Sequence, residues 1–292
     1  MTAVREHAAA RDPSLDRLQT ATRVLLVAFI ALTLVATNQL FVLARHTATL
    51  FSWTIQPPLS AAFLGASYAA GCVLSVLAFR SRSWRAARTA LVTVLVFAVL
   101  TLAATLLHLD RFHFAAPGHV ARAAAWIWLG VYLVVPLALL VVVLRQGRTA
   151  VSPGPARAPL PPWLSGLLVL QGVVLGIAAV GLFVVPTTAA RWWPWTLTPL
   201  TARMIAAWLA ALAVAALLSV RERDVSRVTI PAVAYVVFGT LQLVALVLYG
   251  EAVAWGSVAS GVYVGALVVA LVTGAVGLVL AAHRRSTARR NP

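Results

Sequence analysis

Charged and aromatic residues able to contact a ligand gather in the connections between long apolar segments. Arg203 lies about one turn inside such a segment, where a guanidinium group close to hydrocarbon needs a counter-charge. Asp110 and Glu251 occupy equivalent connections, so we predict an interhelical ion pair between Arg203 and one of them. Such a pair either holds helices together or forms part of a ligand site. The candidate ligand-binding residues are Trp53, Gln56, Asp110, Trp195, Arg203 and Glu251.

Three side chains of metal-ligating type, His108, Asp110 and His113, lie close together in the sequence. On a helix, offsets of two and five residues would turn Asp110 and His113 about 200° and about 140° away from His108, so the three would not share a face. Only a loop would gather them, and we predict no metal site. A haem would need facing axial histidines, and only His108 lies near a helix.

The motifs of the common membrane and nucleotide-dependent enzymes are also missing from the sequence. It contains no Walker motif, no acidic pair of the DxD type, no Gly-rich nucleotide loop and no G-x-S-G segment with a histidine partner in the membrane. We therefore assign no catalytic residue and no cofactor, and a membrane-embedded enzyme is the least favoured class.

The composition is that of a membrane protein. Of the 292 residues, 62% are hydrophobic and 10% are charged, whereas a soluble domain carries about a quarter charged residues. The formal net charge of +16 would suggest nucleic-acid binding in a soluble protein. Here the charges separate long apolar runs, which indicates membrane topology rather than a nucleic-acid partner. A single cysteine, Cys72, excludes an intramolecular disulfide framework.

Eight apolar stretches are long enough to cross a bilayer, which takes about 20 residues of helix. The first is longer than the apolar region of a signal peptide and no clear A-x-A site follows it, so we expect it to stay in place as a membrane helix. The sequence thus predicts an all-α membrane protein. The predicted transmembrane helices cover residues 24–44, 58–79, 89–109, 123–145, 163–186, 200–220, 229–250 and 258–282.

The arginines predict the orientation of these helices. Of the 23 arginines, 18 fall before the first helix, after the last, or in the second, fourth and sixth connections. Because positively charged connections are retained in the cytoplasm, both termini are predicted to be cytoplasmic, in the plasma membrane of a bacterium. The five arginines on the opposite side are Arg45, Arg111, Arg122, Arg191 and Arg203.

A short stretch occurs twice and indicates an internal duplication. A shift of 142 residues places Leu40–Pro57 on Leu182–Pro199 without a gap and superimposes Trp53-Thr54 on Trp195-Thr196. Seven of the eighteen positions are identical, and apolar bias does not supply matching Trp, Thr and Pro residues. One deletion later, Asp110 falls on Glu251. In each copy a proline then opens the next helix, with Gln56 and Thr198 as the nearest candidates for N-caps.

The duplication divides the chain into two parallel four-helix repeats, related by an axis along the membrane normal. Between them lies the only extended Pro/Gly-rich segment, which we interpret as a cytoplasmic linker. The predicted parts are an N-terminal tail at 1–23, a first repeat at 24–145, the linker at 146–162, a second repeat at 163–283 and a basic C-terminal tail at 284–292.

The segments Trp-Thr-Ile-Gln-Pro-Pro-Leu, Trp-Pro-Trp-Thr-Leu-Thr-Pro-Leu-Thr-Ala-Arg and His-Leu-Asp-Arg-Phe-His-Phe resemble those of a family of multi-pass membrane proteins of GC-rich bacteria. The family has no assigned activity. The resemblance implies an integral membrane protein and adds no functional residue.

Two functional classes remain open. The first is a transporter or a protein that binds a small molecule or a lipid, with its site at the outer face between the two repeats. The alternative is a non-catalytic scaffold or sensor subunit whose arginine-rich loops contact a membrane-protein partner or anionic lipid. In both classes the lipid bilayer is the immediate surrounding.

Overall fold

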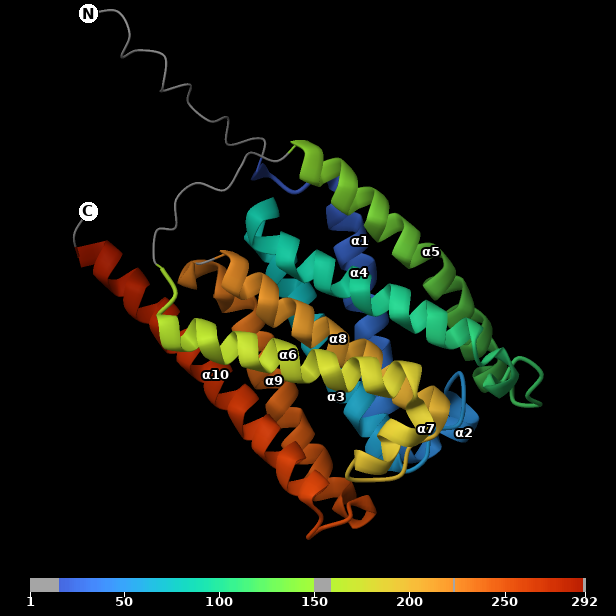
Figure 1. Ribbon diagram of the computed structural model, residues 1–292. Helices are drawn as coiled ribbons and strands as arrows, with labels where there is room; N and C mark the ends of the chain where they lie inside the picture. Colours follow the sequence, from blue (N-terminus) through green and yellow to red (C-terminus); the bar gives the residue numbers. More distant parts are fainter. Residues whose placement is uncertain (1–15, 150–158, 223, 291–292) are drawn as a thin grey trace, which may run out of the picture.

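The computed structural model describes residues 16–149, 159–222 and 224–290, and within these the chain is almost entirely helical (Figure 1). Pairing between extended segments is limited there to three isolated bridges. The α-helices are α1 Thr20–Thr37, α2 Thr47–Leu50, α3 Pro58–Ser81, α4 Trp84–Leu106, α5 His119–Thr149, α6 Pro162–Val184, α7 Pro186–Ala189, α8 Pro199–Glu222, α9 Val225–Tyr249 and α10 Val258–Arg290.

Within the described residues, eight helices are long and apolar enough to cross a membrane, in agreement with the predicted all-α membrane protein. The candidate spans begin and end within a few residues of the predicted ones, and the first continues from α1 through a π-helical turn, Asn38–Val42. α10 extends through Arg290, so residues 284–290, which were predicted to form a tail, are helical. Most of the predicted N-terminal tail and of the Pro/Gly-rich linker lies outside the described residues.

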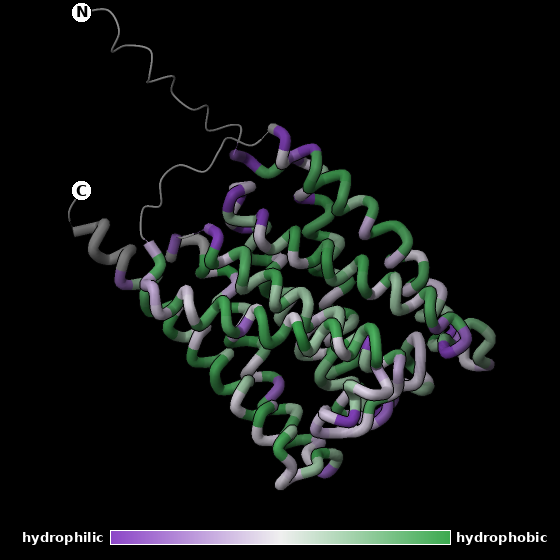
Figure 2. Tube along the Cα trace, viewed as in Figure 1, coloured by the Kyte–Doolittle hydropathy of each residue, from purple (hydrophilic) through white to green (hydrophobic). Residues whose placement is uncertain are grey.

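Figure 2 shows apolar residues along the length of the helices and hydrophilic residues gathered at the two ends of the bundle. We call one end the arginine-rich end: α1, α4, α6 and α9 begin there. The opposite end carries the connections 43–57, 107–118, 185–198 and 250–257, and we call it the tryptophan-rich end. The described chain begins and ends at the arginine-rich end (Figure 1).

Four helices form the interior of the bundle and four lie outside it. In the spanning segments of α3, α4, α8 and α9, 50–61% of the residues are buried, against 22–28% in α1, α5, α6 and α10. The inner helices pack in two pairs, α3 with α9 and α4 with α8, so each pair joins the first half of the chain to the second. α1 covers α3 much as α6 covers α8, and α5 covers α4 much as α10 covers α9.

In each half of the chain, a backbone hydrogen bond joins the two connections at the tryptophan-rich end to each other. The backbone N–H of His113 donates to the carbonyl of Ser52 across 2.9 Å, and that of Ala254 donates to Pro194 across 2.8 Å. The donors lie 141 residues apart and the acceptors 142. At the arginine-rich end, isolated bridges pair Arg17 with Ser83 and Pro159 with Asp224, again at the same spacings.

Proline opens the helix after the connections 43–57 and 185–198. α3 begins at Pro58 and α8 at Pro199, where a missing N–H costs nothing because the first turn of a helix has no acceptor for it. The predicted N-cap at Thr198 is confirmed, since its hydroxyl oxygen accepts from the N–H of Thr201 across 3.2 Å. The predicted cap at Gln56 is wrong: Pro57 precedes α3 and no side chain caps it.

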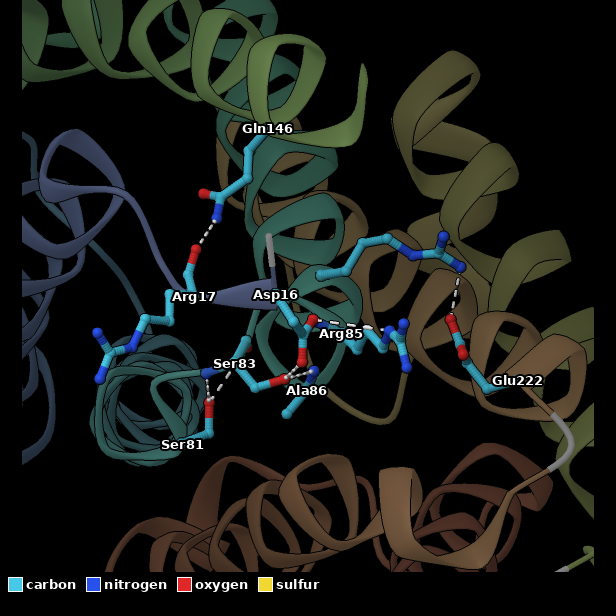
Figure 3. A network of polar contacts seen from close by, with 9 residues as sticks. Asp16, Arg17, Ser81, Ser83, Arg85, Ala86, Gln146 and Glu222 are labelled. Carbon is cyan, nitrogen blue, oxygen red and sulfur yellow. Dashed lines mark hydrogen bonds and ion pairs between the residues drawn. The ribbon is translucent and has the colours of Figure 1, made fainter. Parts of the chain in front are cut away.

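A polar network ties the arginine-rich end together (Figure 3). The carboxylate of Asp16 accepts from the Ser83 hydroxyl across 2.7 Å and from the backbone N–H of Arg85 across 3.1 Å. The Arg88 guanidinium on α4 pairs with the Glu222 carboxylate at the end of α8. This ion pair joins the two halves of the chain at the end opposite to the tryptophans.

Candidate functional site

The two tryptophans of the repeated stretch are buried rather than open to a ligand. Trp53 is 2% exposed and packs against Phe51, Phe112 and Trp128, with ring centroids 4.8–5.2 Å apart. Trp195 is 3% exposed, and its indole N–H donates to the hydroxyl of Ser60 across 2.9 Å. Trp195 therefore holds its connection against the inner helix α3, and Trp53 packs its connection against the connection 107–118 and against α5.

Arg203 does not form the predicted ion pair. Its Nε donates to the carbonyl of Phe183 across 2.9 Å, and its Nη1 lies 3.1 Å from Nε2 of His108. Asp110 pairs instead with Arg111 at 3.0 Å, and Glu251 pairs with Arg45 at 3.5 Å. The reason is local: each acid lies in a single 3-10 turn that points its carboxylate away from the bundle, leaving the side chains 69% and 66% exposed.

The hydrogen bonds of His108 fix its tautomer. Nδ1 lies 3.2 Å from the carbonyl of Ala104, which can only accept, so Nδ1 carries the proton. Nε2 then has a free electron pair and accepts from Arg203. Burial lowers the pKa of His108, and the neighbouring Arg203 guanidinium lowers it further. The imidazole is therefore held in its neutral form.

The candidate metal ligands take separate partners. His113 contacts the carbonyl of Phe51 through Nδ1 at 2.9 Å and the hydroxyl of Thr54 through Nε2 at 3.0 Å. His108 and Asp110 are engaged as described above. In the part of the chain that the structure describes, no three His, Cys, Asp or Glu side chains are grouped so as to hold a metal ion.

The structure contains a cavity that the sequence did not predict. It has a volume of about 540 Å³ and lies between α6 and α10, over α8 and α9, and it reaches the connection 185–198 at the tryptophan-rich end. One residue of the first half, Phe63 on α3, also reaches it. Its lining includes Gln171, Val174, Trp193, Tyr263 and Val269, and the other lining residues are almost all Leu, Val, Ile, Ala and aromatic residues.

The cavity exists because the outer helices of the second half are separated and carry small side chains. α6 and α10 have little contact with each other. In the first half, α5 covers α4 with two large rings, Trp128 and Tyr132, and the Tyr132 hydroxyl lies 2.6 Å from that of Tyr68. On α10 the lining includes Ala266, Val269 and Ala270 instead. The first half is thus filled where the second is open.

Two hydroxyl groups of the cavity lining, those of Tyr263 and Tyr235, form hydrogen bonds within the bundle. The Tyr263 hydroxyl donates to Oε1 of Gln242 across 3.0 Å, and Nε2 of Gln242 donates to the carbonyl of Phe63 across 3.1 Å. The Tyr235 hydroxyl donates to the carbonyl of Leu212 across 3.1 Å. These hydrogen bonds engage the protons of both hydroxyl groups within the bundle.

The sequence carried only faint signals of this cavity. Gln171 is a polar residue within an apolar stretch, and Gly172, Gly176 and Gly181 follow it on the same helix. Small residues either allow two helices to approach closely or leave a space between them. Which of the two happens depends on the neighbouring helices, which sequence periodicity does not identify.

Comparison with models of protein families, with curated proteins and with solved structures finds no match to this chain.

Proposed function

We propose that the protein binds the hydrocarbon chain of a lipid, or of a similar amphiphile, in the cavity between α6 and α10. The observation that carries this proposal is an apolar space of about 540 Å³, within the range of about 300–1,000 Å³ that is typical of ligand pockets. Its borders are open to the surroundings of the bundle, because Val174 and Ile177 on α6 and Val262 on α10 are 50–68% exposed. A hydrocarbon ligand would enter sideways from the bilayer.

This site lies elsewhere than the site that the sequence predicted at the outer face between the two repeats. It lies within the second half, with Phe63 as a contribution from the first. The predicted residues Trp195 and Arg203 remain near it in the chain, since Trp193 lines the cavity and Arg203 bonds to the α6 residue Phe183. In the proposed function Trp195 holds the connection 185–198 and Arg203 holds the end of α6. These two segments border the cavity at the tryptophan-rich end.

The proposal includes the predicted orientation and duplication. The arginine-rich end faces the cytoplasm of a bacterial cell, the cavity opens to the outer leaflet of the plasma membrane, and the chain consists of two parallel four-helix repeats. The matching hydrogen bonds of His113 and Ala254, made at one spacing in the sequence, support the duplication. In this arrangement one repeat has kept or gained the space for a ligand while the other is filled.

Matched substitutions on α6 and α10 test the proposal. Val174 and Val269 line the cavity, whereas their neighbours Val173 and Val268 do not, and all four are 40–50% exposed. We expect Val174→Trp and Val269→Trp to reduce the lipid that co-purifies with the protein several-fold, measured by native mass spectrometry. Val173→Trp and Val268→Trp should retain it. Equal lipid content in all four variants and the unchanged protein would contradict a site in this cavity.

A further inference from the structure

Gln171 lines the cavity and carries an unused hydrogen-bond acceptor. The hydroxyl of Thr273 donates its proton to the carbonyl of Val269 across 2.7 Å, so its oxygen can only accept from Gln171. This fixes the amide, because Nε2 of Gln171 must be the atom that lies 2.9 Å from that oxygen. Oε1 of Gln171 is then left buried without a hydrogen-bond partner among the described residues.

Trp193 lines the same cavity and carries an unused hydrogen-bond donor. Its indole ring packs against Phe63, Trp195 and Tyr263, with centroids 5.3–6.0 Å apart. Its Nε1 is buried, and no described residue accepts from it. A buried polar atom without a partner costs free energy, and more so near hydrocarbon, where water is scarce. Both residues line the cavity, so a molecule bound there can supply the missing partner to each.

The distance between the two atoms restricts the ligand. Trp193 lies against Tyr263 and Gln171 bonds to Thr273, and these two residues are ten positions apart on α10. At a rise of about 1.5 Å per residue this corresponds to about 15 Å along the helix. The lining of α6 runs from Leu167 to Leu182, so the cavity is about 22 Å long. Its volume of about 540 Å³ over that length gives a mean cross-section of about 25 Å², which suits one extended chain.

We infer that the cavity takes a single-chain amphiphile that carries two polar groups. An oxygen of the head group accepts from Trp193 near the tryptophan-rich end, and a hydroxyl group about 15 Å along the chain donates to Oε1 of Gln171. This inference rests on the proposed function and narrows it from hydrocarbon chains in general to hydroxylated ones. The aliphatic walls between the two polar atoms accommodate the chain.

Two fatty acids that differ by one hydroxyl group test this inference. The probes are octadecanoic acid and the same acid with a hydroxyl group at its twelfth carbon, titrated onto the full-length protein in detergent and followed by native mass spectrometry. We expect the hydroxylated acid to bind roughly tenfold more tightly, the factor that corresponds to one hydrogen bond made by an otherwise unpaired buried atom. Gln171→Met should remove this preference, and an unchanged melting temperature in detergent would show that the variant is folded. Trp193→Phe should weaken both probes by a similar factor.

The possible failures are distinguishable. Equal affinity of the unchanged protein for both acids would overturn the hydroxyl preference while leaving the hydrocarbon site in place. Loss of both probes in Gln171→Met would assign Gln171 a structural role only and would overturn the inference as well. If neither probe binds and the purified protein carries no lipid, the proposed function itself fails.

Discussion

Arg203 on α8 and His108 at the end of α4 lie 3.1 Å apart, Nη1 to Nε2, and join the second half of the chain to the first near the tryptophan-rich end. The contact depends on a neutral imidazole, since Nδ1 of His108 already donates to the carbonyl of Ala104 and only Nε2 can accept. A second proton on His108 would place two positive groups against each other. The contact is therefore sensitive to acid.

The pKa of His108 is lowered by burial and by Arg203, so the unfolded chain takes up this proton at a higher pH than the folded protein does. As the pH falls below about 6.5, the ordinary value for histidine, the unfolded state binds more protons and the free energy of unfolding decreases. We predict that the melting temperature in detergent falls between pH 7 and pH 5 and that His108→Gln makes this fall smaller.

The exposed histidine His46 provides the control for this measurement, because it lies at the same end of the bundle. His46→Gln should keep the pH dependence of the unchanged protein. Identical slopes for His108→Gln and the unchanged protein would show that other groups cause the acid sensitivity.

The sequence was sufficient to predict the eight spanning helices because the constraint on them is simple. Hydrocarbon excludes unpaired backbone polar groups, so any apolar run of the right length must be helical. Thus the candidate span Pro58–Ser81 was placed to within two residues. The internal similarity was visible for a related reason, since Trp, Thr and Pro stand out in a chain made mostly of Ala, Val and Leu.

The contacts of the candidate site residues could not be predicted from the sequence. Asp110 and Glu251 both lie in connections at the tryptophan-rich end, but one short 3-10 turn in each connection directs them outward to Arg111 and Arg45. The cavity depends on the space between α6 and α10, two helices that are far apart in the chain and are uniformly apolar. A helix that faces lipid on one side and apolar helices on the other has no polar face from which its rotation can be predicted.

The packing of α3 on the π-helical turn Asn38–Val42 requires a glycine. A Cβ atom on Gly65 would lie 2.5 Å from the backbone nitrogen of Phe41 and 2.8 Å from the carbonyl carbon of Leu40. Backbone atoms cannot rotate away as side chains can, so one of the two helices would have to shift. We predict that Gly65→Ala destabilises the protein by about 1–3 kcal/mol, as is typical of overpacking, seen as a lower melting temperature in detergent.

Gly130 on α5 is the matched control, since a Cβ atom there would meet nothing within 4 Å. Gly130→Ala should leave the melting temperature unchanged or raise it slightly, because alanine favours a helix more than glycine does. If the two variants melt at the same temperature, the close approach at Gly65 does not contribute to stability.

The orientation of the chain can be tested by labelling single cysteines. Replacing Cys72 by serine gives a background without cysteine. Ala115 and Gly147 are both exposed and lie at the tryptophan-rich and the arginine-rich end, respectively. In intact bacterial cells we expect a membrane-impermeant maleimide to label Ala115→Cys, and to label Gly147→Cys only after the membrane is permeabilised. The reverse order would place the termini outside the cell.

Two ion pairs at opposite ends of the bundle should differ strongly in their contribution to stability. Glu222 pairs with Arg88 between α8 and α4, and its side chain is only 6% exposed. Glu251 pairs with Arg45, and both of these side chains are more than half exposed. Removing a charge from a buried pair leaves the other charge poorly solvated, whereas exposed pairs are worth about 0–1 kcal/mol and are screened by salt.

We therefore predict that Glu222→Gln lowers the free energy of unfolding by about 1–3 kcal/mol, the range for a hydrogen bond to a charged group, while Glu251→Gln changes it by less than about 1 kcal/mol. Denaturation of the purified protein in mixed micelles, followed by tryptophan fluorescence, measures both. Raising the salt concentration should reduce the small effect of Glu251→Gln and leave most of the effect of Glu222→Gln, because buried charges are screened less. Equal effects of the two substitutions would mean that the Arg88–Glu222 pair does not hold the two halves together, and that the α3–α9 and α4–α8 contacts do so without it.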